Sequence, residues 1–434
     1  MPSTFGPARL LSASGRHVLL AANARRALVR DGKGGMLAFA LSTGISEMPL
    51  TALGLQAASV SRMVRHGAMR SRAGRAALGA ELATAEVLRE LHQGVSATAG
   101  VVESALVAGL GRDYRAKITE AGLAFENRPL TRRQSVIPAW VSHRRYVRHG
   151  NVGYGPAGKR NTLDIWRRDR VSASGPAPVL VQVHGGAWVA GSNRQQAYPL
   201  LSHLADSGWV CVAINYRLSP RATWPDHVVD VKRAIAWVRS HIGEYGGDPD
   251  FVVVSGGSAG GHLAMLAALS PGHLDWQPGF EAADTRVQAA VSLYGVYDLL
   301  NWDGRGGNQR SIKFVASNVM KVAPGDDPKA WHQASPVNWV TGDAPPTMLV
   351  HGTADSVVPL DMARRMARQM RAESASPVVY AELPLAQHAF DLLGSVRTLH
   401  TVRAIERFLA FVRAQARPAA AEPAAPVAPV DLAP

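Results

Sequence analysis

A serine set between glycines, in the stretch Gly256-Gly257-Ser258-Ala259-Gly260, is the feature of this sequence best suited to chemistry. The stretch lies where an apolar run typical of a strand, residues 251–255, meets a run of small residues typical of a helix, residues 261–269. In so tight a turn the serine takes a strained backbone conformation that exposes its hydroxyl, and the glycines keep Cβ atoms out of a crowded corner. Ser258 is therefore a candidate nucleophile.

Three other groups with useful chemistry also come directly after apolar, strand-like runs. They are the turn His184-Gly185-Gly186-Ala187-Trp188, the carboxylate of Asp355 and the imidazole of His388. Strands that alternate with helical segments form a mostly parallel sheet, and the carboxyl ends of its strands meet at one edge. We therefore expect these groups to lie close to Ser258, although they are far from it in the sequence.

The order glycine turn, Ser, Asp, His resembles that of α/β-hydrolases and differs from that of chymotrypsin or subtilisin. Residues from about 152 to 413 resemble the hormone-sensitive-lipase-like and bacterial carboxylesterase group, which includes Lip-type esterases. The stretches that carry the resemblance are His184 to Trp188, Asn215 to Pro220, Gly246 to Pro249, Gly256 to Gly261, and His351 to Asp355 with Val358-Pro359. The resemblance implies an α/β fold, a mostly parallel sheet covered by helices, with a lid insertion and an N-terminal helical extension.

One position departs from the family pattern. The usual His-Gly-Gly-Gly turn has alanine at its third glycine position, Ala187, and His-Gly-Gly-x-Trp also resembles kynurenine formamidases and some small-ester hydrolases. A backbone N–H survives the change from glycine to alanine, so this turn could still bind an oxyanion.

These residues predict a serine hydrolase site. His388 would accept the proton of the Ser258 hydroxyl, because neutral imidazole titrates near working pH. Asp355 would fix the tautomer of His388 and stabilise the imidazolium. Trp188 and His262 are expected to line the substrate pocket.

The tetrahedral intermediate of such a reaction needs preorganised donors for its oxyanion. The donors that we expect are backbone amides at two turns. They are those of Ala259, Gly186 and Ala187, with Gly185 shaping the turn.

Other residues could fill these roles. Asp298 follows a strand-like run and could be the acid in a variant arrangement, whereas His351 and His184 belong to turn motifs and are expected to be structural. Cys211, the single cysteine, lies in an apolar run and is read as core. No residues have metal-ligand spacing and no loop is suited to cradling phosphate, so we expect no metal and no cofactor.

The chain divides into three parts by its patterning. Residues 1–150 are expected to be mostly helical and to present a packing stripe, residues 151–413 to form the catalytic domain, and residues 414–434 to be a disordered Ala/Pro-rich tail. An irregular stretch at about 301–333 is interpreted as a lid. The stripe consists of Leu88, Leu91, Val95, Val102, Leu106 and Leu110, with Glu81, Glu86 and Glu90 expected on the opposite side.

The net charge of +14 belongs mostly to the N-terminal part, where residues 1–150 carry 21 Lys and Arg against 9 Asp and Glu, or +12. Few aromatic residues accompany these cations and no nucleic-acid motif is present, so we expect no nucleic-acid partner. The basic region could contact an anionic membrane surface. We expect a cytoplasmic or peripherally membrane-associated protein that is not secreted.

Residues 34–61 carry one charge, Glu47, and are long enough to cross a bilayer. A carboxylate near the centre of a spanning helix is costly, and polar residues dilute the apolar character. We interpret this segment as a buried or interfacial helix.

The function expected is hydrolysis of a small carboxylic ester of short to medium acyl chain through an acyl-enzyme intermediate. Two alternatives stay open at this point. One is an amide hydrolase, an aryl formamidase or a peptidase-like enzyme with the same triad, and the other is a non-catalytic scaffold on the same fold. The sequence does not indicate an oligomeric state.

Overall fold

The computed structural model describes residues 7–29, 32–126, 129–131, 143–168, 175–300 and 309–416. In these ranges an eight-stranded sheet has the order β1-β2-β4-β3-β5-β6-β7-β8. The strands are β1 Val147–Gly153, β2 Thr162–Trp166, β3 Ala177–Val183, β4 Val210–Ile214, β5 Gly247–Gly257, β6 Ala289–Leu293, β7 Thr347–Gly352 and β8 Val378–Leu383. Strands β3 to β8 pair in parallel, and β1 and β2 pair antiparallel at one edge.

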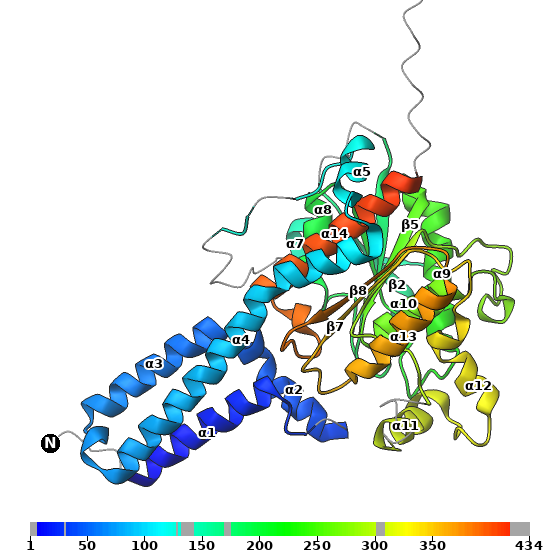
Figure 1. Cartoon of the computed structure of the whole chain (residues 1–434). Coiled ribbons are helices and arrows are strands. Elements are labelled where there is room, and N and C mark those ends of the chain that lie inside the picture. Colours follow the sequence, from blue (N-terminus) through cyan, green and yellow to red (C-terminus); the bar gives the residue numbers. More distant parts are fainter. Residues whose placement is uncertain are drawn as a thin grey trace, which may run out of the picture.

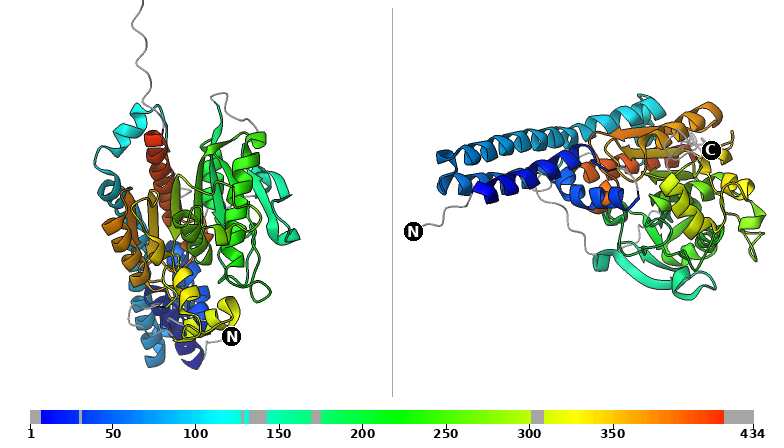
Figure 2. Two further views of the ribbon diagram at one scale, coloured as in Figure 1. Left: turned by 90° about the vertical axis from the view of Figure 1, so that its right-hand side faces the viewer. Right: turned by 90° about the horizontal axis from the view of Figure 1, so that it is seen from below.

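The helices that the structure describes lie on both faces of this sheet and in an N-terminal group. They are α1 Pro7–Arg25, α2 Gly32–Glu47, α3 Pro49–Arg65, α4 Arg72–Leu110, α5 Tyr114–Glu120, α7 His143–Tyr146, α8 Tyr198–Asp206, α9 Asp226–His241, α10 Ala259–Leu269, α11 Gln309–Val315, α12 Pro328–Gln333, α13 Leu360–Glu373 and α14 Val396–Ala416. Helices α9, α10 and α13 cover one face of the sheet, and α8, α14 and the second half of α4 cover the other (Figures 1 and 2). The α/β fold class expected from the sequence is confirmed.

The central strands explain this layering. The parallel strands β3 and β4 are buried along their whole length and consist mostly of Val, Leu, Ile and Ala, because both of their faces are covered by helices. Strand β1 begins before residue 150, which the sequence pattern gave as the end of the helical part. Strand β1 pairs with β2 from Val147 onward, so a boundary at residue 150 would cut through a strand of the sheet.

Helices α1 and α3 pack on the first half of α4 and together form an arm that projects from the body that contains the sheet (Figures 1 and 2). The predicted stripe from Leu88 to Leu110 is buried as expected, and its second half packs in the same core as β8 and α14. The position of Glu81 was wrong, since it is buried within the arm rather than exposed. It accepts hydrogen bonds from Ser14 (2.8 Å) and Gln56 (2.8 Å) and lies 2.9 Å from Nδ1 of His17.

Residues 34–61 do not form one helix. Helix α2 ends at Glu47 and α3 begins at Pro49, whose ring cannot continue the preceding hydrogen-bond ladder, and the two axes differ by 89°. Within the described ranges no single helix combines the length and apolar character needed to cross a bilayer. Only the bent pairs α2 with α3 and α4 with α5 meet these criteria, and only when their halves are joined.

Cys211 is buried in β4, as expected for a core residue, and burial raises the pKa of its thiol. Two segments predicted from the sequence fall wholly or partly outside the described residues. The tail from residue 417 and the start of the predicted lid, residues 301–308 with Trp302, lie outside the described residues.

Candidate active site

Ser258 stands between β5 and α10 in the strained conformation that its sequence context predicts. Its φ is 58°, and its backbone N–H donates to the carbonyl of Leu293 at 3.0 Å. A Cβ on Gly256 would lie 2.3 Å from the backbone of Gly260, and a Cβ on Gly260 would lie 2.2 Å from the carbonyl oxygen of Val183. Only glycine fits at these two positions, so the turn that exposes the serine depends on them.

The structure brings Ser258, His388 and Asp355 into one hydrogen-bonded line. Nε2 of His388 lies 2.9 Å from Oγ of Ser258, and Nδ1 lies 2.8 Å from Oδ2 of Asp355. The other carboxylate oxygen of Asp355 accepts the backbone N–H groups of Val357 and Val358, each at 2.8 Å. A carboxylate on Nδ1 favours the tautomer with its proton there, which leaves the Nε2 lone pair facing the serine hydroxyl.

Asp355 is ionised in this setting. Burial alone would raise the pKa of its carboxyl, but the charge of His388 and hydrogen bonds from His351 and His388 hold that pKa below its ordinary value. Nε2 of His351 lies 3.3 Å from Oδ2 of Asp355 and 2.9 Å from the carbonyl of Val358. His351 therefore supports the Asp355 carboxylate, whereas the sequence predicted only a structural place in a turn.

The glycine turn lies beside Ser258 and takes an unusual backbone path. Gly186, Ala187 and Trp188 have φ values of 122°, 52° and 62°. The N–H of Gly185 donates to Oε1 of Gln196 at 2.7 Å, so Gly185 shapes the turn and its amide is occupied. Among the described residues, the amides of Gly186, Ala187 and Ala259 have no hydrogen-bond acceptor. These are the three amides that the sequence predicts as oxyanion donors.

Trp188 and His262 were both expected to line the substrate pocket, and they differ in this respect. Trp188 lines it, whereas His262 is buried behind the indole and does not, which corrects its expected place. The indole N–H of Trp188 donates to Nδ1 of His262 at 3.2 Å, and Nε2 of His262 lies 2.7 Å from the carbonyl of Ala334. Burial lowers the pKa of His262 to about 4, so the ring is neutral and can accept the indole hydrogen bond.

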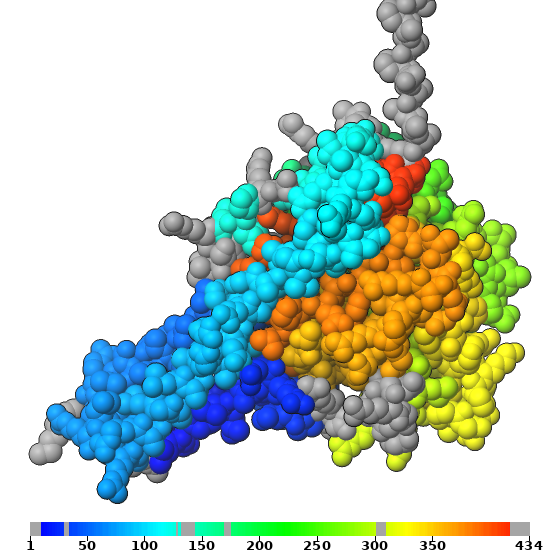
Figure 3. Space-filling view, viewed as in Figure 1, coloured from blue at the N-terminus to red at the C-terminus, as the bar shows by residue number. Residues whose placement is uncertain are grey.

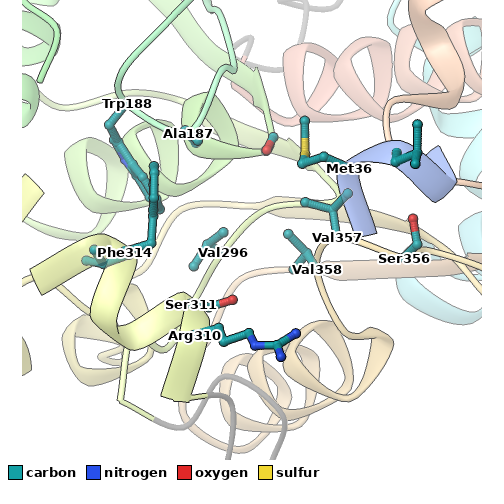
Figure 4. Close-up of a pocket in the computed structure, with 14 residues that line it drawn as sticks. Met36, Ala187, Trp188, Val296, Arg310, Ser311, Phe314, Ser356, Val357 and Val358 are labelled. Atoms are coloured by element: carbon teal, nitrogen blue, oxygen red, sulfur yellow. The ribbon is translucent and has the colours of Figure 1, made fainter. Parts of the chain in front are cut away.

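A cavity of about 710 Å³ opens above Ser258. Met36 comes from α2 on one side, and Phe314, Ser311 and Arg310 come from α11 on the other, with Trp188 beside Phe314 (Figure 4). The remaining lining residues are Leu37, Ala187, Ser258, Ala259, Val296, Val315, Ser356, Val357 and Val358. Most of these side chains are apolar, so the cavity suits an apolar substrate group.

Helix α2 is the part of this site that the sequence did not predict. Its Phe39 ring meets the His388 ring edge-on at 5.9 Å, and Nε2 of Gln387 donates to Oγ of Ser42 at 3.1 Å. Oγ of Ser356, next to the acid, donates to the carbonyl of Gly35 at 3.2 Å. An apolar pattern in a helix shows which residues share a face but not which part of the fold that face contacts.

Tyr294 and Asp391 are further neighbours of His388, and no pattern in the sequence singles them out. The Tyr294 ring lies 4.7 Å from the imidazole, and its hydroxyl donates to the carboxylate of Asp391. Both groups are buried, and burial raises the pKa of Tyr294 well above its ordinary value. They form a rigid support behind the imidazole.

The other candidates do not join this group. Asp298 lies 4.0 Å from the guanidinium of Arg365 and does not contact His388. His184 is buried against Tyr216, and burial lowers its pKa to about 4. In the part of the chain that the structure describes, no cluster of three His, Cys, Asp or Glu side chains could hold a metal ion.

Known proteins that are similar to this chain are carboxylic ester hydrolases and esterases. The family model BD-FAE matches residues 163–370. The chain is 45% identical over 398 residues to the probable carboxylic ester hydrolase LipM of Mycobacterium tuberculosis, covering 90% of both chains. It is 46% identical over 318 residues to esterase LipQ of the same organism, covering 72% of this chain and 74% of LipQ.

Among solved structures, a truncated carbohydrate esterase from gut microbiota matches with a TM-score of 0.51 and 22% identity, over 61% of this chain and 99% of that one. At that identity the match bears on the fold alone. The relation to LipM covers 90% of both proteins. The chain therefore belongs to the Lip-type carboxylic ester hydrolases of the α/β-hydrolase superfamily.

Proposed function

We propose that this protein hydrolyses carboxylic esters through an acyl-enzyme on Ser258. Oγ of Ser258 attacks the carbonyl carbon while its proton passes to Nε2 of His388. The bond to the alcohol oxygen then breaks, and His388 returns the proton to that oxygen. Water attacks the acyl-enzyme in the same way, with His388 as the base, and Ser258 is restored as the acid product leaves.

The observation that carries this proposal is the hydrogen-bonded line from Ser258 through His388 to Asp355 at the floor of an apolar cavity. Each side chain has one role that its contacts support. Asp355 is held by two backbone amides and keeps His388 in the tautomer that can accept a proton. Ser258 faces the cavity, where a carbonyl carbon can reach it.

The three unoccupied amides of Gly186, Ala187 and Ala259 are the proposed oxyanion donors. Two belong to the glycine turn and one begins α10, where the helix dipole adds positive potential. The strained backbone at Ala187 and Trp188 aims the turn, and the contact from Trp188 to His262 holds it. We propose that His262 is a positioning residue for this turn.

The proposed substrates are monoesters with a short to medium acyl chain. The cavity lies within the range of small-molecule sites, which is about 300–1,000 Å³, and its apolar lining offers few partners for a charged acyl group. Emulsified long-chain triglycerides are expected to be poor substrates. Carboxylic ester hydrolysis is also what the name of LipM states.

A panel of p-nitrophenyl esters from acetate to palmitate, run beside aryl formamides, tests this proposal. We expect the highest kcat/KM for short to medium chains and little formamide cleavage. Ser258→Ala, with an unchanged melting curve, should abolish the ester activity. Faster cleavage of the formamides would assign the site to amide hydrolysis, and equal activity of folded Ser258→Ala would overturn the mechanism.

A further inference from the structure

Helix α2 exposes apolar residues and buries polar ones. Over residues 34–47, where the burial of α2 is described, the exposed residues recur at helical spacing and are apolar or glycine: Met36, Leu37, Ala40, Leu41 and Gly44. Its opposite face is buried against the protein and is partly polar, with Ser42, Ser46 and Glu47. A surface helix of a water-soluble protein normally has the reverse arrangement.

The buried polar face is firmly held. The Glu47 carboxylate pairs with the guanidinium of Arg397 on α14, neither of them exposed, and accepts the hydroxyl of Ser395 at 2.8 Å. Nδ2 of Asn23 donates to the carbonyl of Ala38 at 2.8 Å and ties α2 to α1. These contacts fix which face is exposed, so the apolar face is a stable feature of the fold.

The arm also exposes apolar side chains, around an interior that contains buried apolar residues as well as buried polar ones. Its interior holds the Glu81 carboxylate with its partners Ser14, His17 and Gln56. Its outside carries leucines, of which Leu19 is 60% exposed, Leu55 71% and Leu82 75%. Most of the large hydrophobic side chains that the described chain exposes belong to α1–α4 and the links between them.

The apolar face of α2 is continuous with the mouth of the catalytic cavity. Met36 and Leu37 are both more than half exposed, and both line that cavity. Leu41 lies one helical turn beyond Leu37 on the same face. Leu28 and Val29, both exposed, lie in the link that leads into α2, where Val29 packs beside Gly34. A binding partner or surface that covers this face would therefore also cover the entrance to the cavity above Ser258.

The charges around this surface select its partner. The far end of the arm, where α3 turns into α4, carries exposed arginines, and the space-filling view shows that end projecting from the body (Figure 3). The exposed arginines there are Arg62, Arg65, Arg70, Arg72 and Arg75. Exposed leucines beside a basic cluster match a lipid surface with anionic headgroups, whereas a second copy of this chain would bring like charges together.

We propose that α2 and the arm dock on an anionic lipid surface, which places the mouth of the catalytic cavity against the membrane. Substrate esters dissolved in that membrane then enter between α2 and α11 without crossing water. The helices lie on the surface and do not span it. The docking does not depend on the proposed hydrolysis, whereas the entry of membrane-dissolved esters rests on it.

The test is flotation of the whole chain with vesicles of phosphatidylcholine with and without phosphatidylglycerol. Wild-type protein should float with the anionic vesicles and release partly at high salt, where surface charges are screened. The double variant Leu28→Glu/Leu41→Glu should bind about tenfold less, because it puts two charges into the apolar layer. Neither residue lines the cavity, so hydrolysis of soluble p-nitrophenyl acetate should stay at the wild-type rate and serves as the folding check.

Leu274→Glu is the matched control, since Leu274 is 58% exposed on the catalytic body, as Leu28 is 61% exposed beside α2. It should float like the wild type. Equal flotation of the double variant, or no flotation of the wild type, overturns the proposal. A wild-type dimer in solution that Leu28→Glu/Leu41→Glu dissociates would assign the face to a second copy. Because flotation needs no turnover, its failure is distinct from failure of the ester hydrolase mechanism.

Discussion

At the scale of single residues, the position of His388 is set from several directions at once. Asp355 holds Nδ1, Ser258 lies at Nε2, and the rings of Tyr294 and Phe39 contact the imidazole. The side-chain oxygen Oε1 of Gln387 accepts the backbone N–H of His388 at 2.9 Å and that of Ser356 at 2.7 Å, which joins His388 to the loop that holds Asp355. Little freedom remains for the imidazole to leave its working orientation.

Asp355→Asn should lower kcat by about 10⁴ at neutral pH, because an amide favours the wrong tautomer of the histidine. Asp298→Asn is the matched control and should change kcat little, since Asp298 contacts Arg365 rather than His388. Both variants are to be compared as proteins with the same melting curve. A larger loss in Asp298→Asn would move the acid to the loop after β6.

His227 predicts a pH dependence of stability. Burial, with a smaller effect of Arg217, lowers its folded-state pKa to about 4 from 6.5. Between these values the unfolded chain binds a proton that the folded chain does not, so stability is present above pH 6.5 and is lost as pH falls toward 4. We expect His227 to lower the free energy of unfolding by about 1–2 kcal/mol on going from pH 7 to pH 5.

Urea unfolding of the wild type and of His227→Gln at both pH values isolates this effect. Glutamine can still donate to Oγ of Ser219, which lies 3.1 Å from Nε2 of His227, but it does not titrate. The variant should lose less stability than the wild type on going from pH 7 to pH 5. Equal losses in the two proteins would show that His227 is protonated in the fold or exposed to water.

At the scale of elements, the sequence predicted best where local geometry alone decides. The turn at Ser258 and the polar residues at strand ends could be placed because parallel strands deliver their carboxyl ends to one edge. Helix α2 could not be placed, since its contacts with Gln387, Ser356 and Arg397 join residues more than 300 positions apart. Glu81 was misplaced because its partners Ser14, His17 and Gln56 lie on other helices, and a helical pattern does not show which helices meet.

Helix α2 should influence the choice of acyl chain. Leu37→Ala removes apolar surface from the cavity wall, so KM for a p-nitrophenyl octanoate should rise about threefold to tenfold, as expected for loss of a partly buried leucine contact. KM for the acetate should change little, because its acyl group is too short to reach that wall. Chain-length profiles of the two proteins give the answer, and a uniform change across all chain lengths would remove Leu37 from the acyl site.

The contact between α2 and α14 should show strong coupling. Arg397→Met leaves the Glu47 carboxylate buried without its cation and should lower the free energy of unfolding by about 3–5 kcal/mol. The double variant Arg397→Met/Glu47→Leu removes both charges and should recover most of that loss. Denaturant unfolding of the wild type, both single variants and the double variant measures the coupling, and additive losses would mean that the pair is solvated.

At the scale of the whole molecule, the N-terminal helices are part of the enzyme. The second half of α4 packs on β8 and α14, and α2 forms a wall of the catalytic cavity. A cut at residue 150 would therefore expose the core and open the site, so tests of the arm need point variants in the whole chain. Charge and composition alone suggested a separate basic region. They could not show that its helices pack on the rest of the protein, because they carry no information about which surfaces meet.

The central claim is that His388 and Asp355 activate Ser258 as the nucleophile of this hydrolase. Labelling with a fluorophosphonate, followed by mass mapping of the modified peptide, tests it most directly. The account predicts one adduct, on Ser258, with labelling abolished in Ser258→Ala and slowed by at least about 10³ in His388→Ala, because the unassisted hydroxyl is a weak nucleophile. An adduct on another residue, or labelling of folded His388→Ala at the wild-type rate, would contradict the account.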